Sequence, residues 1–408
     1  MFIEVPIISI HNILLLLSIL LLVPTIILLL ECSSALLPDR KEIDTFEGQS
    51  EKPSIAILVP AHNENQVINQ TLNALLPQLS DQDRIIVIAD NCRDNTAELA
   101  RKLGVTVIER NNLAQVGKGY ALEYGLCFLK SNLSDLPEVV IVVDADCIVS
   151  PSSISQIALE AAKSHRPVQA LYLMEQKSSS SPKSLISVLA FKIKNLVRPR
   201  GLNKLGLPCL LTGSGMAFPW SLICNVPLAS DNLVEDMQLG IDLLIAGYPP
   251  LFVEEAKVTG LFPQQETASK SQKKRWIHGH LQTILTQVPR LWQETWIQRR
   301  WDLAVVALDI LVPPLSLLVL SWLMILCGGL FLGVAYQQWL ILIMAIFEGI
   351  LIFSAIFGAW LKFARQDIPF KTLLNIPIYT LRKIPTLLAF WRKRQVKWIK
   401  TERDITIS

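Results

Sequence analysis

The sequence predicts an α/β domain with transmembrane α-helices at both ends, and three observations support this fold class. Residues 53–290 alternate short apolar strands with amphipathic segments, which is typical of a mainly parallel sheet covered by helices. Apolar segments flank this region, and about 20 such residues suffice to cross the hydrocarbon core of a bilayer. Polar, mostly acidic residues follow three of the predicted strands, at the sheet edge where ligands bind.

The first apolar segment, residues 7–30, is predicted to be transmembrane helix 1. A secretory signal peptide would begin with a cationic stretch and would have a shorter apolar core. This N-terminus instead carries Glu4 and has no Lys or Arg before the segment. We therefore expect an anchor.

The C-terminal apolar block is predicted to hold two further spans. Residues 303–335 comprise an interfacial segment, which ends at a pair of prolines, and transmembrane helix 2. Residues 339–360 form transmembrane helix 3, with a tryptophan at each end as at a membrane–water boundary. Glu348 inside that span is expected to form a hydrogen bond to another helix. Residues 366–400 are broken by prolines and contain many Lys and Arg residues, so we expect an interfacial amphipathic tail on membrane lipids.

Basic residues set the expected orientation. They lie beside each span, at Arg40, Lys41, Arg299, Arg300, Lys362 and Arg365. Because cytoplasmic flanks are enriched in Lys and Arg, we expect an integral membrane protein whose α/β domain is cytoplasmic. The seven cysteines form no CxxC pair, which fits reduced thiols in that compartment. The formal net charge of +3 gives no basis for nucleic-acid binding.

The α/β domain is predicted to begin with four strands, over residues 54–59, 84–89, 105–109 and 139–143, with helices that end near 76, 103 and 130. Asn63 and Glu64 follow the first strand, Asp90 the second, and Asp144 and Asp146 the fourth. These side chains are expected to converge at one edge of the sheet. The sequence has no GxGxxG and no GxxxxGK[ST], so neither a dinucleotide-binding fold nor a P-loop is supported.

Asp144 and Asp146 are the candidate metal ligands. Two carboxylates close together repel each other unless a cation lies with them, which favours a hard divalent ion, Mg²⁺ or Mn²⁺. Such an ion would neutralise a departing nucleotide diphosphate. The structural alternative is a turn in which an Asp caps the next helix. The other acidic groups at this edge favour the metal.

Other polar residues have both a functional and a structural interpretation. Asp90 can accept hydrogen bonds from a base or ribose, whereas Asp94 nearby can cap a helix. Lys118 lies between two glycines at a helix start, where a phosphate is favoured. Glu235 and Asp236 begin a helix that ends near residue 246. They either stabilise its macrodipole or supply a general base.

Gln272, Arg275 and Trp276 fall at i, i+3 and i+4 and therefore share one helix face. The planar guanidinium of Arg275 can bind a diphosphate through two hydrogen bonds, and Trp276 offers a flat surface to a sugar ring. The alternative is a solvated or lipid-facing surface on a basic helix.

Six segments in this order resemble glycosyltransferase family 2, in the branch of cellulose, chitin and hyaluronan synthases and ceramide glucosyltransferases. They are VPAHNE (59–64), ADN (89–91), GKG (117–119), DAD (144–146), VED (234–236) and QKKRW (272–276). The resemblance covers residues 53–289 and implies a GT-A nucleotide-binding sandwich. Two segments depart from the family pattern: ADN stands where many members have a double Asp followed by Gly, and Val234 stands where synthases usually have Thr.

The resemblance also implies residue roles. Asp236 would be the catalytic base, and Asp144 and Asp146 would hold the metal. The nucleotide sugar would contact Asn63, Glu64, Asp90, Lys118, Asp144 and Arg275. The acceptor would contact Gly213, Ser214, Glu235, Gln272 and Trp276.

The expected activity is inverting transfer of a sugar from a nucleotide-diphosphate donor, with a UDP-sugar expected, to a glycan in polysaccharide synthesis. Three spans are few for a secretion channel, so a partner subunit would be needed for export. A glycolipid synthase acting on a lipid hydroxyl is the alternative, and the anchor and basic tail suit it. An inactive scaffold or sugar-nucleotide sensor would be expected to have lost an acid or the Arg-Trp pair, and all are present.

Overall fold

The computed structural model describes residues 4–38, 52–132, 135–176, 182–229, 234–262 and 266–381, with side chains described except at 4–8, 182 and 266–270. These residues divide into two compact units. The sheet unit comprises the described residues of 52–176 and 208–279, and the helix unit those of 4–38, 182–207 and 280–381. Residues 182–207 and 280–290, expected in the α/β domain, thus group with the apolar helices.

The sheet unit contains a mixed sheet of eight described strands, in the order β3-β2-β1-β4-β7-β6-β8-β5. The first four strands of the chain lie close to their predicted positions and pair in parallel. β7 is antiparallel to both β4 and β6, so the second half of the sheet departs from the parallel pattern. The strands are β1 (Ile55–Ala61), β2 (Arg84–Asp90), β3 (Thr106–Arg110), β4 (Val139–Val142), β5 (Cys147–Val149), β6 (Val168–Glu175), β7 (Met216–Pro219) and β8 (Leu251–Leu261).

Helices cover both faces of this sheet. Successive residues of a strand point to opposite faces, so neighbouring residues pack with different helices. In β1, Ile57 packs with α2, α3 and α5, whereas Leu58 packs with α4, α8 and α9. Both side chains are fully buried, and each contributes about 1.5–3 kcal/mol to stability. These helices are α2 (Ile68–Leu75, continued by the 3₁₀ turn Leu76–Gln78), α3 (Thr96–Lys102), α4 (Lys118–Asn132), α5 (Ser153–Ser164), α8 (Trp220–Ile223) and α9 (Glu235–Ile245).

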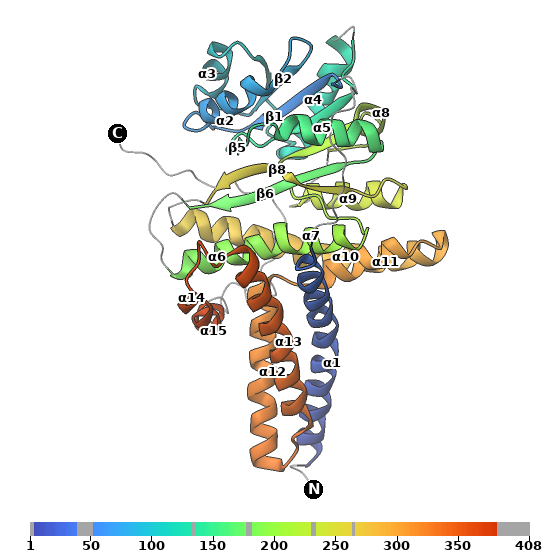
Figure 1. Ribbon diagram of the computed structural model, residues 1–408, viewed down its shortest axis with the longest axis vertical. Helices are drawn as coiled ribbons and strands as arrows, with labels where there is room; N and C mark the ends of the chain where they lie inside the picture. Colours follow the sequence, from blue (N-terminus) through green and yellow to red (C-terminus); the bar gives the residue numbers. More distant parts are fainter. Residues whose placement is uncertain are drawn as a thin grey trace. The chain divides into compact units, whose positions relative to one another are not determined.

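The helix unit contains α1, α12 and α13, which run side by side (Figure 1) and share one apolar core. Each contains a segment long and apolar enough to cross a membrane: Ser9–Ala35, Leu315–Tyr336 and Leu340–Phe363. The apolar helices expected at both ends of the chain are thereby confirmed. The helices are α1 (Glu4–Ala35), α6 (Pro182–Lys192, continued by the π-turn Ile193–Val197), α7 (Arg198–Lys204), α11 (Trp301–Leu311), α12 (Leu315–Tyr336), α13 (Leu340–Phe363), α14 (Lys371–Leu374) and α15 (Ile376–Leu381).

α10 (Glu266–Gln298) begins in the sheet unit and continues into the helix unit at His280. The segment expected at the membrane interface before span 2 forms α11. The first part of the expected interfacial tail includes α14 and α15, and residues 382–400 lie outside the described residues.

Buried polar groups connect the helices of this unit. Glu348 of α13 is fully buried and accepts a hydrogen bond from Ser18 Oγ of α1 at 2.8 Å, as expected. Arg198 of α7 donates from Nε to Glu31 Oε2 at 2.6 Å and also pairs with Asp309 of α11. Glu31, Arg198 and Asp309 are all buried. α1, α7 and α11 are therefore joined by charges that have little access to water.

Candidate active site

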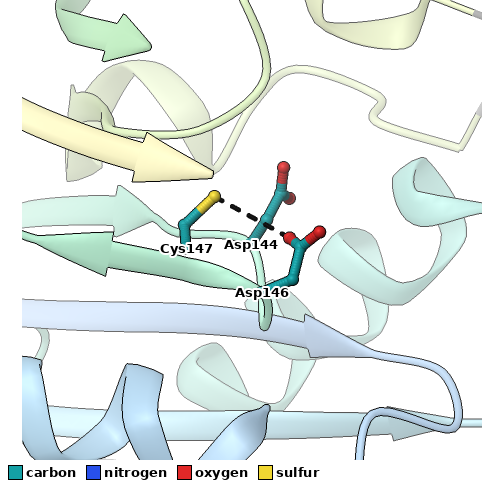
Figure 2. Close-up of side chains that lie close together, drawn as sticks. All are labelled: Asp144, Asp146 and Cys147. Atoms are coloured by element: carbon teal, nitrogen blue, oxygen red, sulfur yellow. Dashed lines mark hydrogen bonds between the residues drawn. The ribbon is translucent and has the colours of Figure 1, made fainter. Parts of the chain in front are cut away.

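The loop between β4 and β5 carries the predicted metal ligands together with a thiol (Figure 2). Asp144, Asp146 and Cys147 each offer one ligand atom, and these atoms lie within 4.8 Å of one another. The Cys147 thiol donates to Asp146 Oδ1 over 3.7 Å. Burial and the two adjacent carboxylates raise the pKa of Cys147 well above its ordinary value, which keeps the sulfur protonated.

This donor set fits a hard divalent cation. Mg²⁺ and Mn²⁺ prefer carboxylate oxygens, and Asp144 and Asp146 supply two of them. Burial raises the pKa of Asp144, and the neighbouring charge of Asp146 raises it further, although Lys118 acts in the opposite direction. A cation bound here would relieve that repulsion.

Lys118, the first residue of α4, connects the acidic loop to the opposite side of the site. Its ammonium group pairs with the Asp144 carboxylate and donates to the carbonyl oxygen of Gly213. Burial lowers the pKa of Lys118, but Asp144, Glu235 and Asp236 together raise it above the ordinary value. Lys118 therefore lies within the electrostatic reach of acids from two separate segments of the chain.

Gly213 lies directly against Asp236. Its φ of +99° belongs to a region that side chains with a Cβ rarely adopt. A Cβ at this position would lie 3.0 Å from Asp236 Oδ2 and 3.8 Å from Lys118 Nζ. Glycine is therefore needed here both for the backbone conformation and for the close approach of the carboxylate.

Glu235 and Asp236 are the first two residues of α9. Burial raises the pKa of Glu235 to about 7, with a further contribution from Asp236, while Lys118 and Arg275 lower it. Arg275, on α10, thus acts electrostatically on Glu235. Ser214 adds another link, because its Oγ accepts a hydrogen bond from the backbone N–H of Asp144 at 3.1 Å.

Asp90 has a buried partner that the sequence interpretation missed. Arg110, at the end of β3, pairs with Asp90 Oδ1 at 2.8 Å and donates to the carbonyl oxygen of Gln115 at 2.8 Å. Gln115 precedes Lys118 by three residues, so this pair supports the loop that leads into α4. The position of Arg110 directly after a predicted strand, at the same sheet edge, was the available signal. Nucleotide binding by Asp90 stays a prediction.

Asn63, Glu64 and Asp94 join the loops that follow β1 and β2. Asn63 Oδ1 accepts from the backbone N–H of Arg93 at 2.6 Å, and the Glu64 N–H donates to Thr96 Oγ1 at 2.8 Å. Asp94 Oδ1 accepts from the N–H of Thr96, the first residue of α3, at 3.1 Å, but the N-cap residue of that helix is Asn95. Asn63 and Glu64 contribute to loop architecture here, and donor contact by either stays a prediction.

Gln272, Arg275 and Trp276 lie on α10 as predicted. Gln272 is buried, and its Oε1 accepts no hydrogen bond from the described part of the chain. A buried acceptor without a partner costs about 1–3 kcal/mol, so this oxygen is a candidate contact for a ligand. Arg275 and Trp276 are both partly buried.

Comparisons with known proteins agree with this geometry. Residues 53–279, over half of the chain, match the family model described as "Glycosyltransferase like family 2". The chain is 26% identical over 250 residues to a Bacillus subtilis protein named "Probable glycosyltransferase YdaM", with 59% of this chain and 58% of that protein covered. It is 25% identical over 252 residues to the poly-beta-1,6-N-acetyl-D-glucosamine synthase of Staphylococcus aureus, with 60% and 57% covered.

A shorter match is to the 4,4'-diaponeurosporenoate glycosyltransferase of Staphylococcus haemolyticus, 31% identical over 121 residues, with 28% of this chain and 30% of that protein covered. The chain thus spans less than two thirds of the length of these relatives.

Among solved structures, the mannosyltransferase PcManGT from Pyrobaculum calidifontis, in complex with GDP-Man and Mn²⁺, aligns with a TM-score of 0.56. Its sequence identity is 14%, and the alignment covers 94% of this chain and 99% of that one. This likeness confirms the GT-A fold. Taken with the family match over the whole region that carries the six segments, it shows that the chain belongs to glycosyltransferase-like family 2.

Proposed function

We propose that the protein is a metal-dependent, inverting glycosyltransferase that moves a sugar from a nucleotide-diphosphate sugar onto a glycan acceptor. One observation carries this proposal: Lys118 contacts both Asp144 and the carbonyl of Gly213, against whose Cα the Asp236 carboxylate lies. The Lys118 ammonium group thus links two parts of the site. One is Asp144, which is suited to a metal ion with a diphosphate, and the other is the loop beside Asp236, which is suited to accept the proton of an acceptor hydroxyl. UDP-sugars are the expected donors, and the GDP-Man bound by PcManGT makes GDP-mannose a second candidate.

The reaction follows from these positions. Asp236 accepts the proton of the acceptor hydroxyl, and the oxygen attacks the anomeric carbon of the donor. The bond from that carbon to the diphosphate oxygen breaks, and the leaving diphosphate takes the electron pair near Lys118 and Arg275. A divalent ion held by Asp144 and Asp146 would supply neutralising charge to the diphosphate. One displacement inverts the anomeric centre, so an α-linked donor gives a β-linked product.

The choice of Asp236 over Glu235 as base rests on its surroundings. A Cβ on Gly213 would lie 3.0 Å from Asp236 Oδ2 and 3.8 Å from Lys118 Nζ, so the Asp236 carboxylate approaches the same loop residue as the ammonium group that pairs with Asp144. Glu235 is influenced by Arg275 and has a pKa of about 7, so it can hold a proton near neutral pH. A protonated Glu235 reduces the repulsion beside Asp236.

The test uses the purified full-length protein in detergent with Mn²⁺ or Mg²⁺ and labelled UDP-N-acetylglucosamine, UDP-glucose or GDP-mannose. We expect transfer from one of these donors and a loss of about 10²- to 10⁴-fold in kcat for Asp236→Asn, with donor binding retained. Asp242→Asn is the matched control, because Asp242 lies on the same helix and its carboxylate accepts hydrogen bonds from Gln238 Nε2 at 3.0 and 3.1 Å. Near-normal transfer by Asp236→Asn with donor bound would contradict the base assignment.

A glycolipid synthase is the second candidate. The short match to an enzyme named for 4,4'-diaponeurosporenoate, together with the three apolar helices, favours it. The same assay separates the two, because lipid-extractable label indicates a lipid acceptor and high-mass label indicates a polymer. Export of a polymer would call for a partner subunit.

We propose that the sheet unit is cytoplasmic. Lys362, in the last turn of α13, donates to the carbonyl oxygens of Ala35 and Leu36 at 3.2 Å each, so a basic residue caps the end of span 1. Basic residues gather at cytoplasmic flanks, which supports this orientation.

A further inference from the structure

We infer that Gln169 is a positioning residue for transfer: its side-chain amide holds the loop 212–215 in the conformation that sets Lys118 and Asp236 beside each other. Gln169 lies on β6, is 2% exposed, and was not among the residues predicted from the sequence. The inference rests on the proposed glycosyl transfer, because the loop matters only if these two side chains act on the same reaction.

The amide of Gln169 bonds backbone groups on both sides of Gly213. Its Oε1 accepts from the N–H of Thr212 at 2.8 Å, and its Nε2 donates to the carbonyl oxygen of Ser214 at 2.9 Å. Nε2 also donates to the carbonyl oxygen of Ala170 at 2.8 Å. The side chain therefore spans the loop at the position of Gly213.

These three partners fix which way the amide points. One N–H requires the amide oxygen, and two carbonyls require the amide nitrogen, so a flipped amide would lose all three bonds. Glutamate offers no donor when ionised, and asparagine is shorter by one methylene. Glutamine is thus the residue that satisfies all three backbone groups from this position on β6.

The loop follows a backbone path that depends on two glycines. Gly213 has a φ of +99° and Gly215 a φ of +70°. A Cβ on Gly215 would lie 2.7 Å from Val258 Cγ2 and 2.8 Å from Ala170 Cβ, so the loop is packed tightly on the sheet. The N–H of Gly215 also bonds the carbonyl oxygen of Val142 at 2.9 Å.

The supported segment touches three parts of the site at once. The Gly213 carbonyl accepts from Lys118, the Gly213 Cα faces Asp236, and Ser214 Oγ accepts from the Asp144 N–H. A shift of the loop would therefore change the spacing between the donor-side and the acceptor-side groups. Misplacement of reacting groups by about 1 Å lowers rates by about 100-fold.

The experiment compares Gln169→Met with a matched control, Ser153→Ala. Methionine keeps the approximate volume of glutamine and removes all three hydrogen bonds. Ser153 is equally buried, and its Oγ bonds the backbone of Lys257 at 2.9 and 3.3 Å and not the backbone of the loop 212–215. Transfer is measured with the donor that supports the highest wild-type rate among UDP-N-acetylglucosamine, UDP-glucose and GDP-mannose, alongside thermal midpoints.

We expect both variants to lose similar stability, but only Gln169→Met to lose about 10- to 100-fold in kcat, with the KM for the donor changed less than about threefold. Equal kcat values for the two variants, in a preparation whose wild type is active, would overturn the inference. A wild type that transfers nothing would overturn the proposed function instead.

If Gln169→Met does not fold, Gln169→Glu takes its place, because the carboxylate keeps an acceptor for the Thr212 N–H and loses only the donors. It should show the same fall in kcat with donor KM retained. Failure of both variants to fold would mean that Gln169 serves the fold alone, and the positioning role would then be wrong.

Discussion

Replacing Gly213 with alanine tests the contact between the loop and Asp236. The new Cβ would meet Asp236 Oδ2 at 3.0 Å, so the carboxylate or the loop must move by a few tenths of an ångström. The backbone must also keep a φ of +99° with a Cβ present, which costs about 1–3 kcal/mol of folding free energy. We expect kcat to fall about 10- to 100-fold, because a displaced base is no longer aligned with the acceptor hydroxyl.

The chain provides a matched control for the backbone strain. Gly247 has the same φ of +99°, but a Cβ there would meet nothing within 4 Å. Gly247→Ala should lose about the same 1–3 kcal/mol while keeping wild-type transfer. Thermal midpoints and steady-state kinetics of the two purified variants separate strain from displacement. If Gly213→Ala were as active as Gly247→Ala, the reasoning that places the base against Gly213 would be refuted.

Three further predictions follow from the charges of the site. Arg110→Met leaves the Asp90 carboxylate buried without its ion-pair partner and should lower the free energy of unfolding by about 3–5 kcal/mol. We expect a lower thermal midpoint and a raised KM for the donor. An unchanged midpoint would contradict this prediction. The pKa of Glu235 is raised from 4.5 to about 7, so the folded state binds more protons than the unfolded state between these values. The contribution of Glu235 to stability in EDTA should therefore fall as the pH rises from 4.5 to 7, and Glu235→Gln should show a smaller slope than the wild type; an equal slope would contradict the prediction. Asp146→Asn should weaken Mn²⁺ binding, measured by calorimetry, by at least about 10-fold, and EDTA should abolish transfer; unchanged affinity would exclude Asp146 as a ligand.

The sequence predicted the parallel half of the sheet well, because three of its four strands, β1, β2 and β4, contain a continuous apolar run that leads into a polar loop. β1 to β4 begin and end within two residues of the predicted strands. The short strands β5 and β7, which pair antiparallel with their neighbours, were missed for a physical reason. β5 has 3 residues and β7 has 4, too few for any periodicity, and their pairing depends on partners far along the chain.

The candidate site likewise contains residues that the sequence identified and residues that it did not. Lys118, Asp144 and Asp236 could be predicted because their residue types and neighbours form recognisable segments. Gln169 could not, because its contacts are with a residue 43 positions away, and for Arg110 the only signal was its place directly after a predicted strand. A polar residue within a strand has no local feature that distinguishes a surface position from a buried one. The grouping of residues 182–207 with the apolar helices was missed for a related reason, since only tertiary packing distinguishes these helices from those of the sheet unit.

Two polar side chains of α1 acquire their partners only late in the synthesis of the chain. Glu31 is paired with Arg198, 167 residues later, and Ser18 is bonded to Glu348, 330 residues later. At about 5–20 residues per second, a ribosome needs roughly 8 to 33 seconds to supply Arg198 after Glu31 has emerged. During that interval the Glu31 side chain must be stabilised by water or neutralised by a proton, because its ion-pair partner does not yet exist. A chain released before Asp309 would also leave Arg198 without one of its two carboxylates.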